Sequence, residues 1–177
     1  GRRIHVTPAP FTPGGPKVSW GGGSVAAARR AGRNGIELFA QGGDHSAMKA
    51  AYAEAAADAG KEPQMCFVPR DDLPTTIFVA EDVDAAWDEL GPYLMHDVRS
   101  YAAINEGNPV TASFSRATTV EELRTENRSH RILTVDQAVE LMQTGFPLTL
   151  HPLAGGLPPE IAWRYLRTVT DVAVPRL

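Results

Sequence analysis

A glycine-rich turn near the N-terminus has the residue types of an anion-binding site. Gly21, Gly22 and Gly23 follow a short apolar stretch. Ser24 then stands where an alanine-rich helix would begin. Glycines let a backbone pass close to a bulky anion, and the first N–H groups of a helix can donate hydrogen bonds to it. The segment has the spacing of neither the dinucleotide fingerprint nor the P-loop. It is therefore either a phosphate cradle or a tight strand-to-helix turn that binds nothing.

A second glycine-rich turn follows the next apolar stretch along the chain. Here Ala40 and Gln41 precede the pair Gly42-Gly43. In barrels, the loops after consecutive parallel strands lie side by side at one end, which is where ligands bind. The two turns could thus hold one phosphate together, although a plain turn is also open for this second loop.

A third segment places His151 at the end of an expected strand, where its side chain can reach a barrel mouth or have a structural role. The remaining histidines and the acidic residues lack metal-ligand spacing, so we expect no metal site. Cys66 is the only cysteine, which excludes an intrachain disulfide, and its apolar surroundings suggest an inert core residue. No nucleophile elbow or kinase signature occurs, so the sequence assigns no catalytic residue.

The elements that must position these residues alternate between strand and helix. Apolar stretches predict strands over residues 17–20, 36–40, 65–80 (split near Pro74, with 75–80 as its second part) and 147–151. Helical patterns predict helices over residues 25–32, 46–59, 83–103, 119–127, 136–143 and 158–172. Such alternation favours an α/β fold with a parallel sheet and right-handed crossovers. Four strand–helix units make half of a TIM barrel, which usually takes about 250 residues.

Composition and charge limit the class of protein. The chain of 177 residues is 43% hydrophobic and 21% charged, which is typical of one soluble globular domain. No apolar run approaches the roughly 18 residues of a membrane span, and the start lacks the apolar core of a signal peptide, so we expect a cytoplasmic protein. The net charge is −4, yet residues 1–36 carry only basic charges. This distribution suits an anionic ligand, and it is equally that of an unevenly charged solvated surface. A basic stripe with interleaved aromatic residues is missing, which disfavours nucleic-acid binding.

Three segments resemble the bacterial luciferase-like monooxygenase family. They are residues 3–16, the turn at 21–24 with the Ala-Ala-Ala-Arg-Arg-Ala helix that follows it, and the ending His-Pro-Leu-Ala-Gly-Gly-Leu-Pro-Pro-Glu-Ile-Ala-Trp. The resemblance covers nearly the whole chain but only the C-terminal half of the family's length. It implies that residues 1–177 form the C-terminal half of a luciferase-like TIM-barrel domain.

The resemblance also implies a cofactor and a function. Members of the family bind FMN or the deazaflavin F420, and they oxidise small organic substrates. By this similarity, the Gly22-Gly23-Ser24 turn and the Ala40-Gln41 region match the place where members hold the cofactor phosphate. We therefore expect part of a flavin-dependent oxidoreductase or monooxygenase. The alternative is a non-catalytic half-barrel that binds a phosphorylated ligand or pairs with a partner subunit.

A half-barrel leaves sheet edges and an inner sheet face without a partner. We place on that face Val18, Phe39, Phe78, Leu148 and Leu150. Each such side chain left in water forgoes about 1.5–3 kcal/mol of burial. Together they approach the whole stability of a domain, about 5–15 kcal/mol. We therefore expect self-association, or a second chain that completes the barrel.

Overall fold

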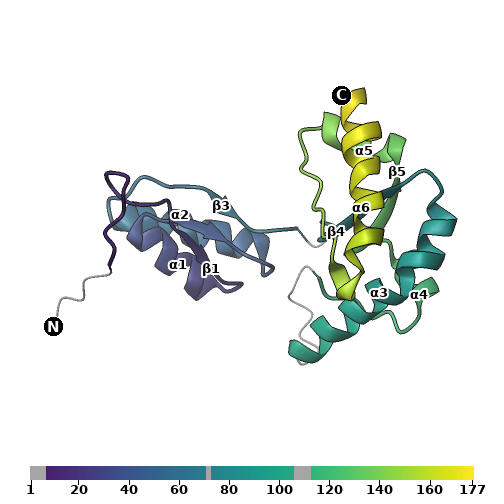
Figure 1. Cartoon of the computed structure of the whole chain (residues 1–177). Coiled ribbons are helices and arrows are strands. Elements are labelled where there is room, and N and C mark those ends of the chain that lie inside the picture. The colour runs from purple at the N-terminus through teal and green to yellow at the C-terminus, as the bar shows by residue number, and fades with distance from the viewer. Residues whose placement is uncertain (1–6, 71–72, 106–112) are drawn as a thin grey trace.

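The computed structural model describes residues 7–70, 73–105 and 113–177 and divides them between two lobes (Figure 1). The N-terminal lobe contains β1 (Ser19–Gly21), α1 (Val25–Asn34), β2 (Glu37–Phe39), α2 (His45–Asp58) and β3 (Cys66–Phe67). The C-terminal lobe contains β4 (Thr76–Ala80), α3 (Val83–Ile104), α4 (Val120–Glu126), β5 (His130–Thr134), α5 (Val135–Gln143) and α6 (Pro159–Arg167). A short 3-10 turn precedes α6 at Ala154–Gly156, and a π-helical turn continues α6 over Thr168–Ala173.

The N-terminal lobe is a parallel three-stranded sheet with both of its helices packed together. The strand order is β1-β2-β3, with Trp20 opposite Leu38 and Leu38 opposite Cys66. Leu38 is buried in one cluster with side chains of α1 and α2, so both helices cover the same face of the sheet. The hydroxyl of Tyr52 donates to Ile36 O at 3.0 Å, which ties α2 to the start of β2.

The C-terminal lobe surrounds a fully buried strand. β4 pairs in parallel with β5, and a single parallel bridge joins Ile77 to Leu150 on its other edge. Phe78 packs among side chains of α3, α4 and α6. Ile77 and Val79 pack on the opposite face, against α5 and the π-helical turn. Because both faces of β4 are covered, its sequence is almost continuously apolar, Thr-Ile-Phe-Val-Ala.

The predicted alternation of parallel strands and helices is confirmed. β1, β2 and β4 overlap the predicted strands, and each pairs in parallel. Residues 147–151 contribute only the one bridge through Leu150. The strands form two separate sheets, and the described residues contain no closed barrel. The partner of β4 is β5, which lies outside the four predicted strands.

The predicted helices also occur, and the first five begin and end within two residues of their predicted bounds. The last, predicted over residues 158–172, is divided into α6 and the π-helical turn that follows it. Ser24 and Asp82 cap α1 and α3 as predicted, because their side chains accept hydrogen bonds from the N–H groups of Ala27 and Ala85. Within the described part of the chain, no helix combines the length and apolar character that crossing a membrane would need.

The expected inner face is only partly uncovered. Val18, Phe39 and Leu150 are 55%, 50% and 37% exposed, in agreement with the expectation. Phe78 and Leu148 do not fit it. Phe78 is 4% exposed and meets the ring of Tyr165 edge-on at 5.8 Å, and Leu148 is partly buried against the cluster that includes α5. The expectation is wrong for these two residues because helices of the same lobe cover both faces of β4.

We expect the protein to self-associate through the edge strand of the N-terminal sheet. β1 pairs only with β2 among the described strands, and the half-exposed Val18 lies beside it. We expect the protein to sediment as a dimer or larger species at micromolar concentration. A Val18→Lys change should shift it toward monomer, since a lysine at a strand edge opposes edge pairing. Phe11→Lys, in the fully exposed segment before the strand, is the control. A stable wild-type monomer would contradict this prediction.

Candidate functional site

The two glycine-rich turns lie side by side at the carboxyl ends of β1 and β2. A Cβ added to Gly23 would lie 3.0 Å from Gly42 O, and one added to Gly43 would lie 2.7 Å from Gly23 O. The two loops therefore pack backbone against backbone, at a distance that a side chain on either glycine would disturb. This is the arrangement expected of loops that follow neighbouring parallel strands.

The N-terminus of α1 faces this junction with groups that suit an anion. The Ser24 hydroxyl oxygen accepts a hydrogen bond from the N–H of Ala27 at 3.2 Å, so its own hydrogen is left to donate. The first turn of α1 contains no acidic residue. In contrast, α2 is capped by Asp44, whose carboxylate accepts from Ala47 N–H at 2.8 Å and places a negative charge there. An anion therefore fits α1 and not α2.

Gly21 and Gly22 leave room in front of the helix. A Cβ on Gly21 would have no atom within 4 Å, so the space beside this backbone is open. Gly22 has φ +150°, and a Cβ there would lie 2.8 Å from the Cβ of Ala27. An open cradle of backbone, helix N–H groups and one hydroxyl has the donor chemistry that a phosphate ester needs. The residues present thus have the chemistry to bind a phosphate group.

Ala40 and Gln41 differ in what they can offer a ligand. Ala40 is buried, and its N–H donates to Phe67 O at 2.9 Å, so it mainly holds β2 beside β3. Gln41 is exposed at the start of the second turn. Of the two predicted residues, only Gln41 presents a polar side chain.

A groove of about 270 Å³ runs from Gln41 toward the C-terminal lobe. Its N-terminal wall includes Phe39 and Phe67, whose rings stack with centroids 4.8 Å apart. Its other wall carries the polar side chains of Thr75, Tyr101, Ser113, Thr149 and His151. Of these residues, only His151 had a sequence signal, because the others are isolated hydroxyl residues in separate segments.

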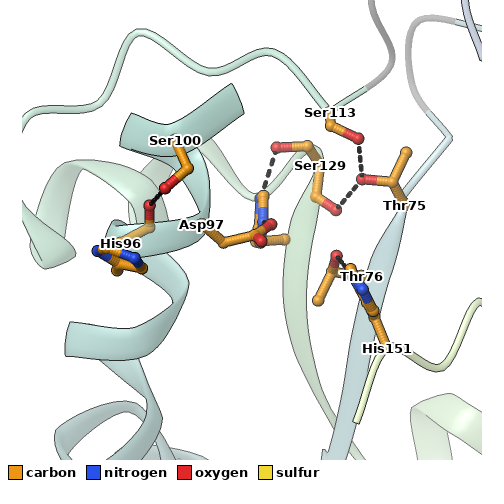
Figure 2. Close-up of polar contacts among 9 residues, drawn as sticks. Thr75, Thr76, His96, Asp97, Ser100, Ser113, Ser129 and His151 are labelled. Carbon is orange, nitrogen blue, oxygen red and sulfur yellow. Dashed lines mark hydrogen bonds and ion pairs between the residues drawn. The ribbon is translucent and has the colours of Figure 1, made fainter. Parts of the chain in front are cut away.

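His151 lies on this groove next to the start of β4, as Figure 2 shows. Its Nδ1 is 3.4 Å from the hydroxyl of Thr76, whose own backbone N–H donates to Ser129 O at 3.0 Å. Nε2 of His151 makes no hydrogen bond to another residue in the described ranges. The prediction that this histidine can reach a ligand is therefore consistent with its place, and its role stays a prediction.

A buried Ser–His–Asp arrangement is linked to the groove through Ser129, whose carbonyl oxygen accepts from the hydroxyl of Thr75. Figure 2 shows Ser129 and Asp97 of this arrangement. His130 Nε2 is 3.0 Å from Asp97 Oδ2, and its Nδ1 is 2.9 Å from Ser129 Oγ. These are the residue types of a hydrolase triad, but Ser129 and His130 are fully buried. Because no substrate can reach that hydroxyl, we interpret the arrangement as a structural link between α3 and β5.

The environment of Asp97 keeps its carboxylate ionised. Burial raises the pKa of this carboxyl, but hydrogen bonds from His130 and from the N–H of Gly155, with the charges of His130 and His151, outweigh burial. The pKa therefore lies below its ordinary value. Asp97 thus joins α3, β5, the turn before α6 and the region of His151.

Two other sequence expectations concern metal and thiol chemistry. Among the residues that the structure describes, no group of three or more His, Cys, Asp or Glu side chains is placed to hold a metal ion. Cys66 lies half-buried in β3, and burial raises the pKa of its thiol. A thiol with a raised pKa carries little of the reactive thiolate at neutral pH.

Comparison with known proteins gives no relative. No family model, no curated protein and no solved structure matches this chain. The function is therefore argued from the residues and geometry described above.

Proposed function

We propose that this chain is part of a flavin-dependent oxidoreductase or monooxygenase that resembles the luciferase-like family, and that its N-terminal lobe binds the cofactor phosphate. One observation carries the proposal. Two glycine turns meet backbone to backbone directly in front of the N-terminus of α1, with open space beside Gly21. A half-barrel of strand–helix units is the fold that this proposal assumes.

In such an enzyme the cofactor supplies the chemistry and the protein binds it, so few acid–base residues are needed at the site. A bound FMN or F420 supplies hydride chemistry, and FMN in its reduced form also reacts with oxygen. The chain itself would hold the phosphate with the N–H groups of α1 and the hydroxyl of Ser24. Gln41 would orient the part of the cofactor next to the phosphate.

The first test compares ligands with and without the phosphate. We expect the protein to quench the fluorescence of FMN or F420 on binding. Riboflavin, which lacks the phosphate, should bind roughly tenfold or more weakly, because charge-assisted hydrogen bonds to the phosphate are lost. Equal affinities for FMN and riboflavin would contradict a phosphate site.

The second part of this test uses substitutions chosen to leave the fold intact. Gly21→Val adds a side chain to open space and should lower FMN affinity about tenfold or more. Ser24→Ala removes the hydroxyl of the α1 cap, and Thr119→Ala removes the matching cap hydroxyl of α4. Both cap changes should cost similar stability. Only Ser24→Ala should weaken FMN binding.

A second function is supported by the edge of the N-terminal sheet at β1, which pairs on that side with none of the strands that the structure describes. A non-catalytic half-barrel would bind a phosphorylated ligand or a partner subunit through the same surfaces. Purified protein that carries the visible absorbance of a flavin or deazaflavin favours the enzyme. Protein that binds inorganic phosphate but neither cofactor favours the non-catalytic alternative.

A further inference from the structure

We propose that the groove between the two lobes binds the substrate, and that this substrate is an uncharged aromatic molecule with a hydrogen-bond donor, such as a phenol. Calling the ligand a substrate rests on the proposed function, whereas the binding itself does not. The inference is carried by the stacked aromatic wall and by the hydrogen bonds of the opposite wall.

The aromatic wall gives a flat ligand a surface to pack on. The rings of Phe39 and Phe67 stack with an interplanar angle of 23°. Phe39 is half-exposed, so its ring is available to a ligand in the groove. Aromatic ligands gain from offset or edge contacts with such rings beyond the burial of area.

The opposite wall offers hydrogen-bond acceptors. Thr149 Oγ1 donates its hydrogen to Pro74 O at 2.6 Å, and Ser113 Oγ donates to Thr75 Oγ1 at 3.2 Å. Thr75 in turn donates to Ser129 O at 3.2 Å. These hydroxyl hydrogens are used within the protein, so the oxygens of Ser113 and Thr149 present lone pairs to the groove. A ligand O–H or N–H group complements them.

The side chains that line the groove and the volume of the groove limit the charge and the size of its ligand. The described residues that line the groove include no Asp, Glu, Lys or Arg. An ammonium group would therefore lose its water without gaining a carboxylate from these residues. A carboxylate only accepts hydrogen bonds, so it would face the lone pairs of Ser113 and Thr149, and among these residues it could pair only with His151. A volume of about 270 Å³ exceeds the roughly 150 Å³ cavity that holds benzene, and it suits one substituted ring or two fused rings.

Three one-ring probes separate these requirements. Phenol has a ring and a donor, anisole has the ring without the donor, and benzoate has the ring with a negative charge. We expect ligand-observed NMR titration of the full chain to show saturable binding of phenol. Anisole should bind about fivefold more weakly and benzoate at least about tenfold more weakly. Absence of phenol binding, or benzoate binding as tight as phenol, would overturn the proposal.

Matched substitutions locate the binding site. Phe39→Leu keeps an apolar side chain but removes the ring, and Thr149→Val keeps the shape but removes the acceptor oxygen. Each should weaken phenol binding about fivefold. Thr144→Val is the control, because the Thr144 hydroxyl also donates to a backbone carbonyl at 2.6 Å, that of Leu141, and this residue does not line the groove. Unchanged phenol affinity in both groove variants, with normal folding by circular dichroism, would overturn the site.

FMN distinguishes this inference from the proposed function. Phenol binding that persists at saturating FMN supports a separate substrate site. Competitive loss of phenol would mean that the cofactor ring occupies the groove, and it would overturn the substrate assignment. Phenol binding in a protein that binds no FMN or F420 supports the groove and refutes the proposed function.

Discussion

Gly155→Ala is expected to destabilise the C-terminal lobe by about 3–5 kcal/mol. A Cβ at this position would overlap the backbone carbonyl of Tyr93 in α3, and a backbone atom cannot move aside without shifting the helix. Gly155 also has φ +61°, a left-handed conformation that costs a residue with a side chain about 1–2 kcal/mol. The change would disturb the hydrogen bond from the Gly155 N–H to Asp97 as well.

The neighbouring glycine provides a matched control for this prediction. Gly156 has φ +78°, but a Cβ there would meet no atom within 4 Å. Gly156→Ala should therefore cost only the conformational term, about 1–2 kcal/mol. Urea unfolding followed by circular dichroism measures both variants. If the two alanines destabilise the protein equally, the close approach of the turn to α3 is not what requires Gly155.

Asp97→Ala is the second large expected effect, a loss of about 2–4 kcal/mol of stability at neutral pH. The carboxylate accepts from His130 Nε2 at 3.0 Å, and His130 is fully buried. Removal of Asp97 leaves this ring nitrogen without its partner in the core. Asp84→Ala is the control, because Asp84 forms an exposed surface ion pair with Arg124. That change should cost no more than about 1 kcal/mol.

The pH dependence of stability provides an independent measurement of the same pair. The pKa of Asp97 is lowered in the folded protein, so its contribution to stability is fully present above the ordinary carboxyl pKa of 3.8. It is lost as the pH falls from that value through the lower native pKa. Wild-type protein should therefore lose stability below about pH 4 more steeply than Asp97→Ala. Parallel acid profiles of the two proteins would show that Asp97 does not contribute in this way.

Local patterns were sufficient to predict the two glycine turns and the cap of α1. Gly21 to Ser24 and the Gly42-Gly43 pair were recognisable because the constraints on a strand-to-helix turn act within a few residues. The cap of α1 by Ser24 and the parallel pairing of β1 with β2 follow from the same short-range rules. The meeting of the two turns could be predicted because neighbouring parallel strands end at the same edge.

The sequence by itself therefore determined the strand–helix alternation and the composition of the glycine turns. Only the tertiary structure decided that Phe78 is buried, that Asp97 meets His130, and that hydroxyl residues from separate segments form one wall of a groove. Asp97 and His130 are 33 residues apart and belong to a helix and a strand with no shared motif. Such contacts depend on how whole elements pack against one another, and the period of a single helix or strand carries no information about its partner.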